Sequence, residues 1–348
     1  MGVVLAGIDE AGYGPMLGPL VVAMSAFEID PWEPGQPAPD LWDLLSRGVC
    51  KKPGKAAKGR IAFDDSKKLK LANDASKHPL THLELGVLSM LALLDLRPKT
   101  DLELLLALGA ELEDHPWYGG EARPLPVAHS EGEIAIASNT LNVAMAQAGV
   151  RPLTIRAKLV CERAFNETIR REGTKAATTA LGVGEHLRTV WESWGKPGPS
   201  HPRLVCDRQG GRQDYGQFLA RLLPRVKPGE EPITVTVIEE TPRASRYDIE
   251  LRDRSPTSPP ANARRLSAVF QPEAESAHLP VALASMTAKY VRELMMARFN
   301  AYWNGQAQKK GLEGLKPTAG YTQDARRWLK DAQCLISKTV RAAMVRNA

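Results

Sequence analysis

The chain has 348 residues, a net charge of +6 and an apolar fraction of 43%, which suits one large globular domain or two small ones. No apolar run approaches the roughly 20 residues that cross a bilayer, so no membrane association is expected. The four cysteines are scattered, with no CxxC or Cys/His pairing, which argues against structural zinc and a disulfide framework. With no basic leader before its first apolar run, the protein is expected to be cytoplasmic.

The first predicted element is an apolar strand that ends in two adjacent acids, Asp9 and Glu10. A Gly-x-Gly-Pro turn follows at residues 12–15, and a second apolar strand, residues 19–27, is predicted to return as a hairpin. Neighbouring side chains of a strand point to opposite faces, so both acids can serve one site only where the strand ends or bends. The pattern favours a divalent-metal site, and a solvated acidic hairpin tip is the alternative.

Strands and helices then alternate along the chain. Helices are expected over most of 75–150 and over 174–194, 213–223 and 279–300, strands over 153–161, 203–206, 233–238, 246–251 and 265–270, and a Pro- and Ser-rich loop over 255–262. This alternation predicts an α/β fold with one central mixed sheet.

Positive charge gathers in three short segments, residues 51–55, residues 67–70 and the pair Arg326-Arg327. They are candidate phosphate-binding segments, because a basic protein with an acidic site suits a polyanionic substrate whose metal ions neutralise the acids. Each segment could equally be a solvated surface.

Three further acids follow predicted strands. Asp207 ends a short buried strand before a Gly-rich loop, which is a common site geometry in α/β sheets, although helix N-caps also use such acids. Glu273 and Glu275 follow the 265–270 strand and precede the long helix, whose dipole they could alternatively stabilise.

As an ordered set, five sequence blocks resemble type 2 ribonucleases H (ribonuclease HII). The blocks are Asp-Glu-Ala-Gly-Tyr-Gly-Pro opening residues 9–22, Asp-Asp-Ser-Lys-Lys-Leu at 64–69, Leu-Val-Cys-Asp at 204–207 with Gly210 and Tyr215, residues 279–293 with Ser285, Lys289 and Arg292, and Gly320-Tyr321-Thr322 through Trp328-Leu329. They bracket nearly the whole chain and cover about a quarter of it.

The resemblance implies a ribonuclease H-like fold and four carboxylates, Asp9, Glu10, Asp207 and Glu275, that hold two Mg²⁺ or Mn²⁺ ions. The family has Asp at the fourth position, so Glu275 is a departure, and Glu273 is a weaker alternative.

The resemblance also implies substrate contacts. Gly12, Tyr13 and Gly14 match the loop that senses a ribose 2′-hydroxyl, where the family has Arg in place of Tyr13. Tyr321 matches a tyrosine that recognises an RNA–DNA junction, although it could also be an ordinary Tyr after a turn. Lys67 and Lys289 are expected to contact phosphate, with Ser66 and Ser285 as hydrogen-bonding supports.

The chain is longer than the family core. We expect residues 1–72 and 153–300 to form the catalytic domain and 73–152 a largely helical insertion. A C-terminal helical segment, 301–348, is expected to contribute to substrate binding.

The implied activity is metal-dependent hydrolysis of the RNA strand of RNA–DNA hybrids, or cutting at ribonucleotides embedded in DNA. Two ions can activate the water and stabilise the leaving oxygen, and carboxylates without His or Cys suit Mg²⁺ or Mn²⁺. The alternatives are a hybrid-binding protein with little or no catalysis, and a nuclease of the same fold with another nucleic-acid substrate.

Overall fold

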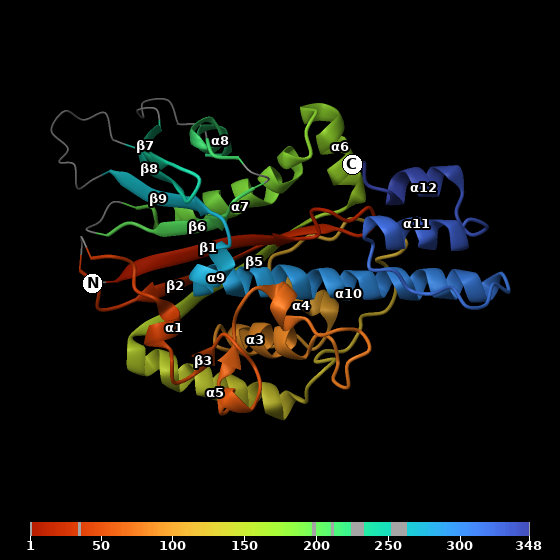
Figure 1. The fold of residues 1–348 in the computed structure, drawn as a ribbon, viewed down its shortest axis with the longest axis horizontal. Coiled ribbons are helices and arrows are strands. Elements are labelled where there is room, and N and C mark those ends of the chain that lie inside the picture. Colours follow the sequence, from red (N-terminus) through yellow and green to blue (C-terminus); the bar gives the residue numbers. More distant parts are fainter. Residues whose placement is uncertain are drawn as a thin grey trace.

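The computed structural model describes residues 2–33, 36–196, 200–209, 212–223, 233–251 and 263–347. These residues form a seven-stranded mixed sheet in the order β5-β2-β1-β6-β9-β8-β7 (Figure 1). The strands are β1 (Val3–Ala11), β2 (Leu20–Ile29), β5 (Val150–Val160), β6 (Arg203–Asp207), β7 (Thr234–Glu240), β8 (Ser245–Leu251) and β9 (Arg264–Gln271). Strands β1, β6 and β9 run parallel to one another, and the other neighbours are antiparallel.

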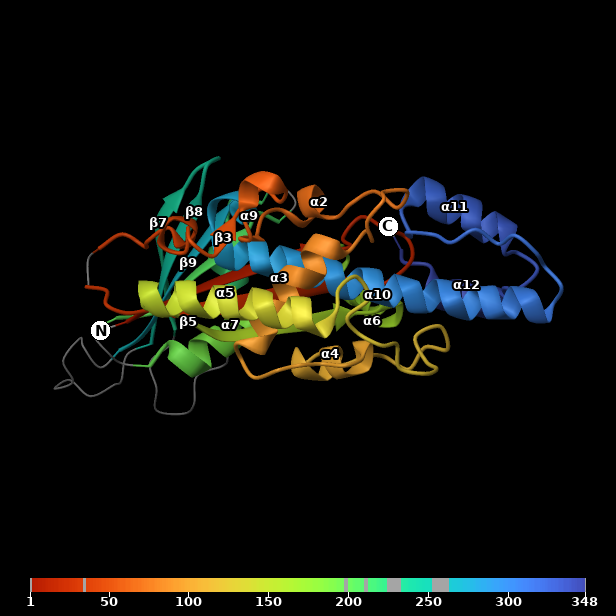
Figure 2. The same cartoon turned by 90° about the horizontal axis from the view of Figure 1, so that it is seen from below.

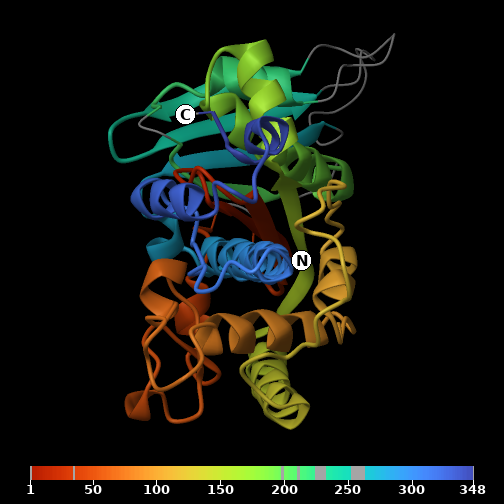
Figure 3. The ribbon, with the colours of Figure 1, turned by 90° about the vertical axis from the view of Figure 1, so that its right-hand side faces the viewer.

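Helices cover both faces of the sheet (Figures 1 and 3). On one face lie α6 (Glu162–Glu172), α7 (Ala176–Trp194) and α8 (Gly216–Leu222). On the other lies α10 (Leu279–Lys309), backed by α3 (Thr81–Ala92), α4 (Asp101–Ala107) and α5 (Glu131–Ala148) (Figure 2). The predicted α/β class with a central mixed sheet flanked by helices is therefore confirmed.

The continuous apolar run of β2 follows from this double cover. Val22 and Met24 pack with α7, whereas Val21 and Ala23 belong to the cluster of apolar side chains around α10. A strand buried on both faces needs apolar residues at every position rather than at alternate ones. The Ser25 hydroxyl donates to Pro280 O at 2.7 Å and ties β2 to the first turn of α10.

Shorter elements complete the chain. They are α1 (Leu41–Leu44), a two-stranded parallel pair of β3 (Val49–Cys50) and β4 (Ile61–Ala62), η1 (Lys55–Ala57), α2 (Ser66–Leu69), α9 (Ala274–Ala277), α11 (Thr322–Asp331) and α12 (Lys338–Met344). None of the helices in the described ranges is long and apolar enough to span a membrane.

The helical character expected for residues 75–150 is present in α3, α4 and α5. Gly149 ends α5 with φ +64°, and a Cβ there would lie 1.9 Å from Asp30 O, so only glycine fits. Leu83, Leu141 and Leu283 share one buried cluster, so α3 and α5 pack in the same core as α10. The division into a catalytic domain, an insertion and a C-terminal segment stays a prediction.

Two expectations differ from the structure. The helix predicted to end at Asn300 continues to Lys309, because buried Trp303 and Ala307 extend its apolar face. Helix α6 was not predicted, although its apolar residues face one side. The loop expected over 255–262 and the glycine at position 210 lie outside the described residues.

Candidate active site

The four predicted carboxylates come from the ends of two strands, β1 and β6, and from one short helix, α9, at the same end of the sheet. Because Ile8 pairs with Cys206 in parallel register, Asp9 and Asp207 follow side by side. Asp207 in turn lies opposite Gln271, after which the chain enters α9 with Glu275. The backbone N–H of Ala274 donates to Asp207 Oδ1 at 3.2 Å and fixes α9 against β6.

Burial raises the pKa of all four carboxyl groups, and repulsion from neighbouring carboxylates adds to the rise for Asp9, Glu10 and Glu275. Burial is the main cause for Asp9, followed by the charge of Glu10, and a hydrogen bond from Ser285 opposes the rise. The pKa of Glu10 is raised to about 7, first by burial and then by the charge of Asp207. Burial is also the first cause for Asp207 and for Glu275, and the charge of Asp207 adds to the shift of Glu275. The four groups therefore form one electrostatically coupled cluster.

Lys67 is a cation that acts on three of the four carboxylates. Its charge lowers the pKa of Glu10, Asp207 and Glu275 alike. Its side chain is exposed and makes no ion pair with any described residue. Asp65 caps the start of α2 by accepting from Lys67 N at 2.9 Å, which fixes where this lysine leaves the backbone.

The two serines predicted to be supports make hydrogen bonds beside the cluster. Ser66 and Ser285 hydrogen-bond to each other through their hydroxyls at 3.1 Å, which joins α2 to α10. Ser285 also bonds to Asp9, so one serine connects the first carboxylate to the helix that packs beneath β1.

The residue types fit a divalent cation, but their arrangement does not yet form a ligand set. The donors are all carboxylate oxygens, and buried Glu275 Oε2 has no hydrogen-bond partner in the structure. Within the described ranges, however, no three Asp, Glu, His or Cys side chains are placed so that they could hold a metal ion. Asp207 Oδ1 is engaged by Ala274 N, and Asp9 Oδ1 accepts from Glu10 N at 2.7 Å.

Glu275, rather than Glu273, faces the other acids. Glu275 is 8% exposed and coupled to Asp207, whereas Glu273 is exposed and precedes α9 with φ +53°. Asp207 also stabilises the local structure, because its carboxylate accepts a hydrogen bond from the backbone N–H of Ala274, the first residue of α9. The sequence had suggested that Asp207 could instead cap the helix that follows it directly in the chain.

The Gly-x-Gly turn packs closely on one side and is open on the other. Gly12 has φ +92°, and a Cβ there would lie 2.5 Å from Arg292 Nε, so glycine is required. Gly14 is exposed and borders open space. Between them, burial and the charge of Glu10 raise the pKa of Tyr13, and Lys175 Nζ lies 5.0 Å from the centre of its ring.

Two buried arginines hold this turn, and one of them, Arg346, was not singled out from the sequence. Arg346 donates to Tyr13 O at 2.8 Å and to Gly18 O at 3.1 Å. Arg292 donates to Leu17 O at 3.2 Å and to Ala319 O at 3.0 Å. No local pattern marks Arg346, because its partners lie more than 300 residues away in sequence.

Tyr321 lies beside the same turn. Gly320 O accepts from Met16 N at 2.8 Å, and the Tyr321 side chain is 48% exposed. Lys289 Nζ is 5.9 Å from the Tyr321 ring centre but pairs with Glu293 Oε1 at 2.7 Å. Tyr321 is thus available to a ligand, whereas the charge of Lys289 is already balanced within α10.

The sequence matches no protein-family model and no curated protein. Among solved structures, it is similar to a chain of the PCNA–ribonuclease HII complex from Archaeoglobus fulgidus, with 14% identity, a TM-score of 0.39, and 99% of this chain and 94% of that one covered. It is also similar to ribonuclease H2 from Pyrococcus horikoshii OT3, with 14% identity, a TM-score of 0.36, and 94% and 86% covered. It is similar as well to Bst-RNase HIII in complex with Mn²⁺, with 13% identity, a TM-score of 0.35, and 99% of this chain and 66% of that one covered.

Proposed function

We propose that this protein is a divalent-metal-dependent endonuclease that hydrolyses the RNA strand of RNA–DNA hybrids or cuts at ribonucleotides embedded in DNA. One observation carries the proposal. Four carboxylates from three separate parts of the sequence gather at one end of the sheet, where burial raises the pKa of each and repulsion from neighbouring acids adds to the rise for Asp9, Glu10 and Glu275. Buried like charges are costly unless a cation compensates them, and Lys67 supplies a single positive charge.

Each residue of the cluster has a proposed part. Asp9, Glu10, Asp207 and Glu275 would hold Mg²⁺ or Mn²⁺, which supplies charge neutralisation at the phosphate and an activated water. Ser285 orients Asp9 through its hydrogen bond. Lys67 balances charge near the reacting phosphate, where its ammonium donates to a non-bridging oxygen.

The turn and Tyr321 are proposed to bind the substrate strand. The open backbone at Gly14 suits close approach of a ribose, and exposed Tyr321 offers a ring for sugar or base contact. Tyr13 lacks the bidentate donors of an arginine, so we expect weaker phosphate binding at this position. Lys289 contacts phosphate only if its pair with Glu293 opens.

The experiment compares wild type with Asp9→Asn on two substrates, an RNA–DNA hybrid and duplex DNA with one ribonucleotide, with Mg²⁺ or Mn²⁺. We expect metal-dependent cutting that Asp9→Asn reduces by at least about 100-fold. Asp74→Asn is the matched control, since Asp74 is exposed and lies outside the site. Metal-independent cutting, or equal cutting by both variants, would overturn the proposal.

A hybrid-binding protein with little catalysis is the second candidate, because the described carboxylates do not form a metal-ligand set as arranged. It predicts tight hybrid binding without cutting by wild type at any Mg²⁺ or Mn²⁺ concentration. A nuclease with another substrate would instead cut neither test duplex but degrade single-stranded RNA or DNA in the same metal-dependent way.

A further inference from the structure

Positive charge is concentrated in one short stretch beside the carboxylates. Residues 49–70 contain eight Lys and Arg and two Asp, a net charge of +6 that equals the net charge of the whole chain. The rest of the chain is therefore neutral on balance. Within this stretch, residues 51–60 connect β3 to β4 and are called the basic loop below.

The fold of the basic loop is fixed by its own backbone. Arg60 donates to Ala57 O at 2.9 Å and to Ala56 O at 3.0 Å, and Ala57 N donates to Gly54 O at 2.9 Å. The loop also contains one turn of 3₁₀ helix whose Ala57 is buried. A loop held in this way presents its side chains at defined positions, which lowers the entropy lost when they bind.

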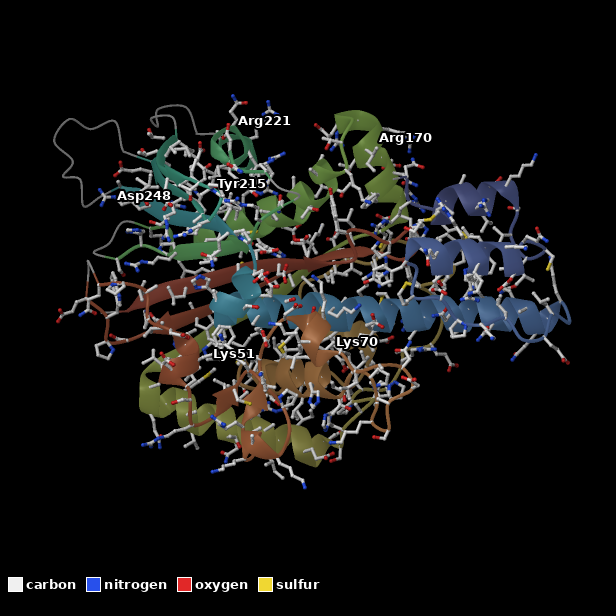
Figure 4. All side chains as sticks on the ribbon, viewed as in Figure 1. Lys51, Lys70, Arg170, Tyr215, Arg221 and Asp248 are labelled. Atoms are coloured by element: carbon white, nitrogen blue, oxygen red, sulfur yellow. The ribbon has the colours of Figure 1, made fainter. Side chains whose placement is uncertain are left out.

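The start of the basic loop is attached to the carboxylate cluster. Lys51 Nζ donates to Ser276 O at 2.8 Å and lies 4.2 Å from the Trp42 ring centre. Lys68 of α2 donates to Ser276 Oγ at 3.1 Å from the same side. Ser276 follows Glu275 directly, so two lysines flank the helix that carries the fourth carboxylate. Figure 4 shows Lys51 and Lys70 on the α9 and α10 side of the molecule, away from Arg170 on α6.

Three lysines of the loop remain without partners. Lys52, Lys55 and Lys58 are exposed, and none of their ammonium groups makes a hydrogen bond or ion pair with the part of the chain that the structure describes. Lys51, Lys68 and Arg60, in contrast, are engaged by protein groups. Unpaired lysines on a fixed loop create a positive potential next to a negatively charged site.

We propose that the basic loop binds the phosphate backbone of a nucleic-acid duplex on the flank of the reacting phosphate, through Lys52, Lys55 and Lys58. The inference rests on the proposed function and adds to it where the duplex runs. Four carboxylates repel a polyanion before metal binds, and a row of free ammonium groups beside them offsets this repulsion. The duplex therefore extends from the cluster past α9 and over the β3–β4 connection.

The test measures binding of an RNA–DNA hybrid over a range of salt concentrations, with a chelator present so that cutting plays no part. The variant is Lys52→Gln/Lys55→Gln/Lys58→Gln, and the control is Arg151→Gln/Arg170→Gln/Arg171→Gln, three exposed cations on β5 and α6 that give the same change of charge. We expect the slope of log K against log salt to become shallower by up to about 0.9 for each lysine removed. At low salt the affinity should fall about tenfold or more.

Duplex length gives a second readout. A hybrid long enough to reach the basic loop should lose affinity in the lysine variant, whereas a hybrid just long enough to cover the cluster should not. Equal slopes for wild type and the lysine variant, or an equal loss in the arginine control, would overturn the inference. Binding is measured without cutting, so the two proposals can fail separately. If the wild-type protein cuts nothing but the lysine variant has a shallower salt dependence of hybrid binding, the role of the basic loop stands and the nuclease proposal fails.

Discussion

The buried arginines and the exposed lysines of this protein are both cationic, but their surroundings differ completely. Arg292, Arg298 and Arg346 are at most 4% exposed and donate to backbone carbonyls or a buried acid. Lys52, Lys55 and Lys58 of the basic loop are exposed, and their ammonium groups have no hydrogen-bond or ion-pair partner among the described residues. Arginine suits the first setting because its planar fork binds several acceptors at once, and lysine suits the second because it stays hydrated. Burial and hydrogen-bond partners, rather than charge, therefore distinguish the arginines that stabilise the fold from the lysines that are available to a ligand.

The largest effect is expected at the most buried ion pair. Arg298 Nε lies 2.7 Å from Asp101 Oδ2, and its Nη2 lies 2.8 Å from Oδ1. Arg298→Ala leaves Asp101 buried without its main partner, so the free energy of unfolding should fall by about 3–5 kcal/mol in denaturant titrations. Arg327→Ala, in a half-exposed pair with Asp324, is the control and should cost less than about 1 kcal/mol. Equal losses of unfolding free energy in the two variants would mean that burial does not determine how much an ion pair contributes to stability.

Arg346 should affect both stability and activity. Its pKa is lowered to about 10, first by burial and then by the charge of Arg292, so its position is costly and depends on its carbonyl partners. Arg346→Ala should lower the free energy of unfolding by about 1–3 kcal/mol and release the turn at Gly12–Gly18. If Arg346 positions this turn, the variant should raise KM for hybrid more than it lowers kcat, and Arg346→Lys should not restore KM, because lysine cannot span both carbonyls.

The control for Arg346 is Arg341→Ala, an exposed arginine on α12. A loss of stability in Arg346→Ala with unchanged KM and kcat would assign this arginine a purely structural role.

The carboxylate cluster predicts an unusual dependence of stability on pH. Folding raises the pKa of Glu10 from 4.5 to about 7, so between these values the folded protein holds a proton that the unfolded chain has released. Stability therefore falls as pH rises through this window. Without metal, Glu10→Gln should raise the free energy of unfolding at pH 8 by about 1–3 kcal/mol and flatten its decline between pH 5 and pH 8. A variant less stable than wild type at pH 8 would contradict this.

The smallest effect on stability is expected in the basic loop. Lys52→Gln/Lys55→Gln/Lys58→Gln should change the free energy of unfolding by no more than about 0.5 kcal/mol, because none of the three side chains has a partner among the described residues. Thermal unfolding at matched ionic strength measures it. A larger loss would show that the lysines have a structural part and would weaken the comparison with the arginines.

The sequence predicted those features whose causes are local. Apolar runs placed the strands and Gly149 marked the end of α5. That Asp9, Glu10 and Asp207 share one site was implied only by the family resemblance, and the parallel pairing of β1 with β6 brings their strand ends side by side. The Ser66–Ser285 hydrogen bond agrees with the supporting role expected for both residues.

Features that depend on packing between distant segments were not predictable. Arg346 meets Tyr13, and Arg298 meets Asp101, only after the whole chain has folded, and no periodicity or spacing marks these pairs. Lys289 and Glu293 are four residues apart on one helix, so their ion pair could have been predicted, but Lys289 was assigned to phosphate contact instead. That Lys52, Lys55 and Lys58 have no ion-pair partner among the described residues likewise depends on the positions of the surrounding acids in the folded chain.

The most direct test of the carboxylate cluster as a metal centre is a calorimetric titration of Mn²⁺ into wild type, Asp9→Asn and Asp207→Asn without nucleic acid. We predict saturable binding to wild type, with proton release near pH 7 because Glu10 must ionise, and at least about tenfold weaker binding to each variant. No saturable binding to wild type, or binding that both substitutions leave unchanged, would contradict the account.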